Sequence, residues 1–371
     1  MSVLLSRSAL AANIETFRRI CTPSRIAAVV KSNAYGHGAG QIVSLLRELL
    51  LPGDFLAVHS LPEAQDLLPS LYCPLLIMGG TPASRDSLLR AINASGREVS
   101  TVASTPLDVL RLTQAEVPFH IKVDTGMGRL GAHGESLDQI FALLETEKQY
   151  FRGIMTHFAN VEDVLNQDYA LLQLKRFEDA VLRARMIRSD IVVHAAASAP
   201  ALLLPAARFD AVRIGIGMYG LWPSQETRLS LHSLGVRAEL RPVLSWHTEV
   251  IHLNHVPRGE FIGYGCTYRT LTDSLIAVLP VGYNEGYARA LSNRAHVLIR
   301  GRRAPVRGRV CMNMIMVDVT HIEDVRPGDE AVLIGSSAEE KVTAEELAEA
   351  SGTINYEVVT RIHHALERRI V

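Results

Sequence analysis

Cysteines and long apolar runs are both scarce in this 371-residue chain. It contains four cysteines: Cys21, Cys73, Cys266 and Cys311. They are far apart and form no Cys-x-x-Cys pair, so no disulfide framework is predicted. No apolar run approaches the length of about 20 residues that spans a membrane. Residues 1–13 lack the basic-then-apolar order of a secretory signal, and Arg7 interrupts them. We therefore expect a cytoplasmic protein with no membrane partner.

An excess of charge of either sign is also missing. Lysine and arginine number 38 and aspartate and glutamate 39, which gives a formal net charge of −1. A nucleic-acid partner favours a strongly basic chain, so none is expected. Hydrophobic residues make up 48% and charged residues 21%, the balance of a folded globular protein. The length suits one large domain and one smaller domain.

Short apolar runs alternate with helical patterns through the first two thirds of the chain. We identify eight such runs: Arg25–Val30, Asp54–Val58, Pro74–Met78, Arg97–Val102, Val117–Val123, Tyr150–Thr156, Asp190–His194 and Phe209–Ile214. Between them, as in Gln41–Leu50 and Tyr169–Ile187, apolar residues recur every three or four positions, which indicates amphipathic helices. Eight strands alternating with helices predict an α/β fold, a parallel (β/α)8 TIM-like barrel. An open doubly wound sheet is the alternative.

After Leu221 the pattern changes to strand-like runs separated by turn residues. The runs are Leu244–Leu253, Ser274–Val278, His296–Ile299, Met314–Val319 and Glu330–Ile334. Two more helices are expected, at Ala344–Ala350 and Tyr356–Arg368. We predict a barrel domain over residues 6–230 and a C-terminal mainly-β domain over residues 231–371, with residues 1–5 able to pair with the second domain. The boundary should fall in the polar stretch Pro223–Gly235.

The decapeptide Val-Val-Lys-Ser-Asn-Ala-Tyr-Gly-His-Gly at residues 29–38 carries the clearest chemical signal. Its Lys31 ends the first apolar run, and barrel enzymes place their chemistry at the carboxyl ends of the strands. A buried lysine is costly unless it is neutral or covalently committed, and a Schiff base with an aldehyde is one such commitment. A surface lysine at a strand end is the alternative interpretation.

This decapeptide closely resembles the segment of alanine racemases whose lysine holds pyridoxal phosphate (PLP). Further segments resemble the same family in the same order: residues 122–131, 156–159, 194–198, 213–220, 263–268, 282–283, 309–312 and 354–357. The resemblance covers nearly the whole chain. It implies a fold-type III PLP-dependent enzyme, with a PLP-binding barrel followed by a β domain.

The resemblance implies that Lys31 holds PLP and acts as one of two catalytic bases. It also assigns a set of cofactor-binding residues: Tyr35, His157, Ser198, Arg213, Gly215, Ile216 and Tyr356. Hydroxyl and backbone N–H groups in this set would donate to the phosphate. Capping and core packing are the alternatives for Ser198 and Tyr356. His157 would pack against the cofactor ring.

Arg213 is implied to face the pyridine nitrogen of the cofactor. Arginine can only donate, so it would keep this nitrogen unprotonated and weaken the electron sink. A weak sink suits a reaction that moves one proton and avoids transamination or decarboxylation. His194 could orient Arg213, although a satisfied core histidine is an equal interpretation.

Tyr264 is implied to be the second base, on the face of the substrate opposite Lys31. Racemisation removes a proton from one face and returns it on the other, so two bases are natural. A free tyrosine ordinarily stays protonated at neutral pH, and a charged relay through His157 and Arg213 could assist it.

The same resemblance implies a homodimer with shared sites. In the family the second base comes from the partner subunit, as do Met312, whose N–H would contact the substrate carboxylate, and Tyr283 at the channel. Arg129 would also engage the substrate. Carbamylation of Lys122 and its pairing with Arg129 are implied in the same way, whereas the residues alone indicate only a strand lysine.

The glycines at 215, 217 and 220 also match a dinucleotide-binding pattern, which requires a following helix. Leu221-Trp222-Pro223 follows instead, then a stretch that we expect to be a polar loop, so a dinucleotide is not predicted. A glycine-rich turn after the eighth strand indicates the usual phosphate site of a barrel.

Four positions, at three sites, depart from the usual family pattern. Ala197 stands where asparagine is common, Asn313 replaces the aspartate after Met312, and Asn284-Glu285 replaces Ala-Asp. These departures concern substrate range and affinity more than reaction type.

The predicted activity is interconversion of L- and D-alanine, which supplies D-alanine for peptidoglycan. Three alternatives remain: a racemase of another small amino acid such as serine, a PLP decarboxylase of the same fold, and a PLP-handling protein without turnover. A decarboxylase would favour a carboxylate over Arg213 at the ring nitrogen. A PLP-handling protein without turnover would lack the β domain.

Overall fold

The computed structural model describes residues 1–162 and 166–371, which divide into two compact units. The barrel unit contains Ala9–Ala34 and Ile42–Arg241, and the β unit contains Met1–Ser8, Tyr35–Gln41 and Pro242–Val371. The β unit is therefore discontinuous in sequence, because it also takes residues from the start of the chain and from the segment after Lys31.

Eight parallel strands form the core of the barrel unit. They are β2 (Arg25–Val29), β3 (Phe55–Val58), β4 (Leu75–Ile77), β5 (Val99–Ala103), β6 (Phe119–Lys122), β7 (Phe151–Met155), β8 (Val192–His194) and β9 (Ala211–Ile214). Neighbours pair in sequence order from β2 to β8, and β9 pairs with β2. Between β8 and β9, the N–H of Asp210 donates to the carbonyl of Val193 at 3.0 Å, and that of Arg213 to Ala196 at 2.8 Å. These bonds bring the ends of the sheet together.

The predicted (β/α)8 barrel is confirmed, and the alternative of an open doubly wound sheet is not favoured. Each of the eight apolar runs contains or overlaps one of the strands. Every residue of β3, β4, β6 and β9 is buried. Parallel strands are covered on both faces, which is why these segments are apolar runs rather than alternating patterns.

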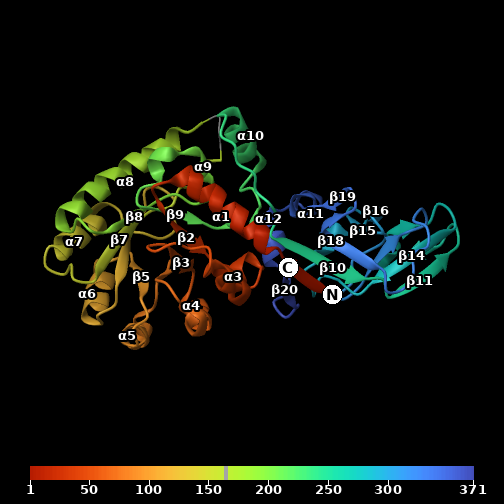
Figure 1. Ribbon diagram of the computed structural model, residues 1–371, viewed down its shortest axis with the longest axis horizontal. Helices are drawn as coiled ribbons and strands as arrows, with labels where there is room; N and C mark the ends of the chain where they lie inside the picture. The colour runs from red at the N-terminus through yellow and green to blue at the C-terminus, as the bar shows by residue number, and fades with distance from the viewer. Residues whose placement is uncertain (163–165) are drawn as a thin grey trace. The chain divides into compact units, whose positions relative to one another are not determined.

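Helices cover the outside of the barrel strands, as α4 to α8 show in Figure 1. Besides the left-handed turn α2 (Lys31–Tyr35), the helices described in the first two thirds of the chain are α1 (Arg7–Cys21), α3 (Ala39–Leu46), α4 (Leu61–Leu67), α5 (Asp86–Ala94), α6 (Pro106–Gln114), α7 (Gly134–Leu144), α8 (Asp168–Ile187), α9 (Ser198–Leu203) and α10 (Gln225–Ser233). In α8 the buried residues recur every three or four positions, the stripe of a helix packed on a sheet. Among the residues described, no helix is both long and apolar enough to cross a membrane.

The stretch after Pro223 is a helix, so the prediction of a polar loop there was wrong. Ser224 caps α10, since its hydroxyl accepts the N–H of Thr227 at 3.1 Å. Leu231 is 1% exposed and anchors the helix. One N-terminal cap and a few buried apolar residues are enough to form this helix. Because most of its residues are polar, the sequence pattern resembles that of a loop.

The β unit contains a seven-stranded mixed sheet in the order β16-β15-β18-β10-β1-β20, with β19 paired to β18. Its strands are β1 (Ser2–Leu5), β10 (Leu244–Glu249), β15 (His296–Ile299), β16 (Arg302–Pro305), β18 (Glu330–Ser337), β19 (Glu340–Val342) and β20 (Arg368–Ile370). Two smaller sheets are formed by β11 (His252–Val256), β14 (Ser274–Leu279) and β17 (Ile315–Asp318), and by β12 (Phe261–Ile262) and β13 (Tyr268–Arg269). Two helices follow, α11 (Ala344–Ser351) and α12 (Asn355–Thr360).

Two predicted elements of the β unit were too long. The run Leu244–Leu253 is split into β10 and β11, because β10 pairs within the large sheet and β11 pairs with β14. The helix predicted over Tyr356–Arg368 ends at Thr360, and Arg368 begins β20. The Arg368 guanidinium donates to backbone carbonyls of four residues in 362–366, which holds that segment in an irregular turn.

Candidate active site

Lys31 lies just beyond β2 and begins α2 (Lys31–Tyr35), a turn of unusual handedness. The four residues after it, at 32–35, all have φ of 53–54°. Left-handed conformation costs non-glycine residues about 1–2 kcal/mol each. Such strain persists only where the surroundings enforce it, and it clusters at functional sites.

Glu63 fixes the start of this turn. One oxygen of its carboxylate accepts the N–H of Ser32 at 2.7 Å, and the other accepts the N–H groups of His59 at 2.7 Å and Ser60 at 3.0 Å. Glu63 therefore caps α4 and holds the Lys31 turn at the same time. The Ser-x-x-Glu spacing at 60–63 is a visible capping signal, but the second role requires the fold.

Four cations interact around the carboxyl ends of β2, β6 and β9: Lys31, Lys122, Arg129 and Arg213. Burial lowers the pKa of Lys31, Arg129 and Arg213 lower it further, and Glu63 opposes them. Burial, followed by the charge of Arg213, lowers the pKa of Lys122 to about 8. The surroundings thus favour neutral amines, the form in which lysine is a nucleophile, and they attract an anion.

The loop that carries Arg129 is organised by Asp124. Its Oδ1 accepts the N–H groups of Gly126 at 2.9 Å, Met127 at 2.8 Å and Gly128 at 3.2 Å. Burial raises the pKa of Asp124, but these donors outweigh it and hold the pKa below its usual value. Asp124 was not among the predicted site residues.

Arg213 is 3% exposed on β9 and is fixed by carbonyl groups. Its terminal nitrogens donate to the carbonyls of Thr156 at 2.7 Å, His194 at 2.8 Å and Ala195 at 2.8 Å. One of them also lies 3.3 Å from Nδ1 of His157. Burial lowers the pKa of Arg213 to about 10, so it remains a cation at neutral pH. Within the described residues its Nε–H makes no hydrogen bond, which leaves one donor for a ligand.

A pair of buried histidines extends from Arg213. Nδ1 of His194 lies 3.0 Å from an Arg213 terminal nitrogen, and its Nε2 lies 2.8 Å from Nδ1 of His120. Gly153 makes room for this contact, since a Cβ there would lie 2.3 Å from the His120 ring. Burial lowers the pKa of His120 to about 3 and that of His194 well below its usual value, so both rings are neutral. His120 was not predicted as a site residue.

Ser198, Gly215 and Ile216 lie together, at the start of α9 and after β9. The Ser198 hydroxyl accepts the N–H groups of Gly215 at 3.1 Å and Gly217 at 3.3 Å. A Cβ on Gly217 would lie 2.5 Å from the Phe17 ring, so only glycine fits there. A cradle of hydroxyl and backbone donors suits a phosphate group. The amine of Lys31, the spare donor of Arg213 and this cradle fit the aldehyde, ring nitrogen and phosphate of PLP.

Tyr35 and Tyr356 are neighbours within the β unit. Their ring centroids are 6.1 Å apart with an interplanar angle of 53°. Burial raises the pKa of Tyr35, so its hydroxyl remains a donor. A Cβ on Gly36 would lie 1.9 Å from the carbonyl oxygen of Val359, so only glycine lets the segment after Tyr35 approach α12 so closely.

Tyr264 is 73% exposed and lines an open groove of the β unit together with Cys311. A Cβ on the following Gly265 would lie 2.9 Å from the guanidinium of Arg309, so the Tyr264 turn packs against the 309–312 segment. Met312 is 56% and Tyr283 43% exposed. Large exposed apolar and aromatic side chains on one unit are typical of an interaction surface.

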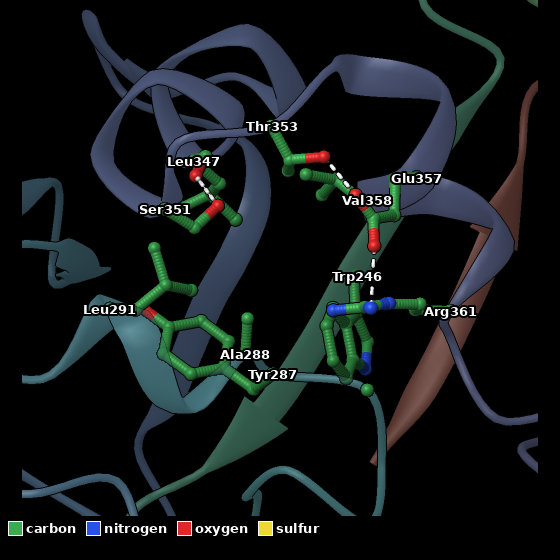
Figure 2. A pocket seen from close by; sticks show the side chains of 11 residues that line it. Trp246, Tyr287, Ala288, Leu291, Leu347, Ser351, Thr353, Glu357, Val358 and Arg361 are labelled. Atoms are coloured by element: carbon green, nitrogen blue, oxygen red, sulfur yellow. Dashed lines mark hydrogen bonds and ion pairs between the residues drawn. The ribbon is translucent and has the colours of Figure 1, made fainter.

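A small pocket lies beside α12 in the β unit (Figure 2). Trp246, Tyr287 and Leu347 form part of its apolar wall, and the ion pair between Glu357 and Arg361 at 2.5 Å lies at its edge. It has room for about one water molecule, too little for an amino acid. The residues around this pocket therefore pack against α12, which carries Tyr356.

Two family models together match most of the chain. The alanine racemase N-terminal domain matches residues 5–223 and the alanine racemase C-terminal domain matches residues 243–370. The chain is 41% identical over 377 residues to the alanine racemase of Leptospira interrogans serogroup Icterohaemorrhagiae serovar copenhageni, a match that covers 99% of this chain and 95% of that protein. It is 42% identical over 350 residues to the alanine racemase of Syntrophobacter fumaroxidans, with 93% and 90% covered.

Solved structures agree with the sequence comparisons. The crystal structure of alanine racemase from Bacillus anthracis with bound L-Ala-P has a TM-score of 0.88 and 32% identity, covering 100% of this chain and 94% of that one. An alanine racemase of Clostridium difficile 630 has a TM-score of 0.90 and 29% identity, covering 100% and 95%. Both units are matched, so the relationship extends beyond a shared barrel. The chain belongs to the alanine racemase family.

Proposed function

We propose that Lys31 binds PLP in this chain and that Lys31 and Tyr264 are the two bases of an alanine racemase. The reaction follows from the family: the chain interconverts L-alanine and D-alanine. The observation that supports this site assignment best is the half-buried Lys31, held beside cations at the start of a strained turn. A lysine in this setting is suited to carry an aldehyde cofactor.

PLP, when bound, supplies an electron sink that stabilises negative charge at the α-carbon of the substrate. Lys31 would hold the cofactor, and His157 would pack against its ring. The cradle of Ser198, Gly215 and Ile216 would hold the phosphate, and the family resemblance assigns the hydroxyls of Tyr35 and Tyr356 to the same group. These donors are neutral, so they hold an anion without adding charge near the amine.

Arg213 limits how strongly the cofactor withdraws electrons. Three carbonyls fix its guanidinium, and only Nε–H is left to donate to the ring nitrogen. An arginine stays charged and cannot accept, so the ring nitrogen stays unprotonated. The restrained sink favours return of the proton over transamination or decarboxylation. A decarboxylase would favour a carboxylate at this position.

Lys31 and Tyr264 exchange the α-proton on opposite faces of the substrate. The lowered pKa of Lys31 favours its neutral amine, which is the form that can act as a base. Tyr264 stands largely exposed on the β unit and, as in the family, would act on the Lys31 site of a partner subunit. Met312, through its N–H, and Arg129 hold the substrate. The working unit is therefore a homodimer with two shared sites.

Lys122 is proposed to carry a carbamate that pairs with Arg129. A neutral amine attacks CO2 and loses one proton, and the lowered pKa of Lys122, about 8, supplies this form. We further infer that the enzyme works in the cytoplasm and supplies D-alanine for peptidoglycan.

A racemisation assay with alanine, serine and lysine tests the proposal. Tyr264, Tyr283, Met312 and Tyr356 should crowd the side chain of the substrate, so kcat/KM for alanine should exceed that for lysine by a large factor. Lys31→Ala is the inactive control. Equal values for lysine would contradict the substrate assignment, and release of CO2 would favour the decarboxylase alternative.

A further inference from the structure

The segments that carry Tyr283 and Met312 lie against each other in the β unit. The N–H of Tyr283 donates to the carbonyl of Cys311 at 3.1 Å, and the N–H of Asn284 donates to that of Met312 at 2.9 Å. A Cβ on Gly282 would lie 2.3 Å from both of these carbonyl oxygens. Only glycine therefore allows the turn at 282–286 to support the 311–314 loop so closely.

Glu285 adds a side-chain connection between the same two segments. Its Oε1 accepts hydrogen bonds from the side-chain amides of Asn313 at 2.7 Å and Asn284 at 2.9 Å, and its Oε2 accepts the N–H of Gly282 at 2.8 Å. Burial raises the pKa of Glu285, but these donors outweigh it and hold the pKa below its usual value. Glu285 is thus an anion that binds three neutral donors.

The turn is fixed on its other side, whereas the loop is exposed. The carbonyl of Glu285 accepts the N–H of His363 at 3.1 Å. A Cβ on Gly286 would lie 2.3 Å from the carbonyl oxygen of Arg361, and the next residue, Tyr287, is 1% exposed in the pocket of Figure 2. By contrast, Met312 is 56% exposed. The contact from Glu285 to Asn313 therefore ties an exposed loop to a rigid turn.

We propose that Glu285 and Asn313 form a latch that positions Met312 and Tyr283 for the substrate. The latch rests on the proposed function in one respect, namely that these two residues contact the substrate. Glu285 and Asn313 act only through them and are positioning residues. The two departures from the family pattern are in contact, since the amide of Asn313 donates to the carboxylate of Glu285 at 2.7 Å. The usual pattern has an aspartate at each of the two positions, but in this chain an aspartate at 313 would replace this hydrogen bond with repulsion between two carboxylates.

Four variants of the full-length holoenzyme test the latch. Asn313→Ala removes the hydrogen bond, and Asn313→Asp also adds repulsion. Glu285→Gln keeps the shape of the turn but leaves one acceptor oxygen for the three donors of Gly282, Asn284 and Asn313. The double variant Glu285→Gln/Asn313→Asp restores a donor and an acceptor with their positions exchanged. Glu339→Gln, an exposed carboxylate in the turn after β18, is the control for loss of one charge.

We expect KM for alanine to rise by about three- to tenfold in Asn313→Asp, less in Asn313→Ala, with kcat changed by less than about twofold. The double variant should return KM to within about twofold of the wild-type value. Additive effects in the double variant, or an unchanged KM in Asn313→Asp, would overturn the proposal.

Thermal unfolding of the same variants distinguishes a contact that only stabilises the fold from one that also positions Met312 and Tyr283. Coupling of the two positions in Tm without coupling in KM would mean that the latch is only structural, which would also overturn the proposal. A wild-type enzyme that does not racemise alanine would instead contradict the proposed function. Coupling in both measurements supports the latch.

Discussion

Arg213 determines which nitrogen of His194 carries the proton. A guanidinium can only donate, and its terminal nitrogen lies 3.0 Å from Nδ1 of His194. Nδ1 must therefore accept, and the proton of the neutral ring is on Nε2. That proton is donated to Nδ1 of His120 at 2.8 Å, so the proton of His120 is on its own Nε2. The three side chains form a chain of hydrogen bonds with a fixed direction, and the positive charge stays on Arg213.

This arrangement predicts loss of stability in mild acid. Burial lowers the pKa of His120 and of His157 to about 3, whereas a histidine in the unfolded chain titrates near 6.5. Between these values the unfolded chain binds more protons, so the free energy of unfolding falls as the pH falls from about 6.5 towards 3. His120→Asn should make this fall shallower in urea unfolding series at several pH values. His321→Asn, a substitution at an exposed histidine, is the matched control, and an unchanged slope in His120→Asn would contradict the assignment.

Borohydride reduction should fix the cofactor on Lys31 and not on Lys122. Both amines have a lowered pKa, so reactivity alone does not distinguish them. The strained turn after Lys31 is the feature that selects it. Peptide mapping of the purified yellow protein gives the answer. Labelling should disappear in Lys31→Ala and persist in Lys122→Ala, and a label on Lys122 would refute the assignment.

Arg213→Glu should change the ratio of transamination products to racemisation products. A carboxylic acid at this position would protonate the ring nitrogen and strengthen the electron sink. Racemisation should fall while transamination by-products rise. The measured quantity is the ratio of the two products, because this ratio does not depend on how much of the variant folds. Arg213→Lys, which keeps the charge, is the control, and an equal ratio in all three proteins would show that Arg213 does not set the cofactor electronics.

Mixed dimers test whether Tyr264 serves the Lys31 site of a partner subunit. Lys31→Ala and Tyr264→Phe should each be nearly inactive alone. After random subunit exchange about half the dimers are mixed, and one of their two sites is intact, so activity should recover to roughly a quarter of wild type. If both residues acted in one chain, every site would carry a defect. No recovery, with exchange confirmed by mass spectrometry, would rule out shared sites.

Residues within continuous motifs could be predicted from the sequence. Lys31 and Arg213 each lie in a segment with specific neighbours. Lys31 follows an apolar run that forms a barrel strand, and Arg213 lies near the end of another. The barrel itself was predictable, because eight buried parallel strands leave eight apolar runs.

Residues whose roles depend on contacts across strands could not be found in this way. His120 meets His194 across 74 residues of sequence, and the space for it is provided by Gly153 on a third segment. Glu63 was visible as a helix cap, yet its bond to Ser32 exists only because β2 and β3 are neighbours. Asn313 and Asn284-Glu285 were noted as separate departures, and only the fold shows that they are in contact.

The pairing of β1 has a consequence for how the chain is made. β1 is synthesised well before its partners in the large sheet, which are β10 and β20, and Val3 pairs with Arg368. The β unit therefore cannot close during most of translation, whereas every strand of the barrel is synthesised before β10. The Arg368 guanidinium also donates to the carbonyl of Gly36 at 2.9 Å. The segment just after Lys31 therefore gains this contact only after Arg368 has been synthesised. A chain whose synthesis stops before β20 lacks Arg368, so the segment around Gly36 loses this hydrogen bond and β1 loses one of its two partner strands.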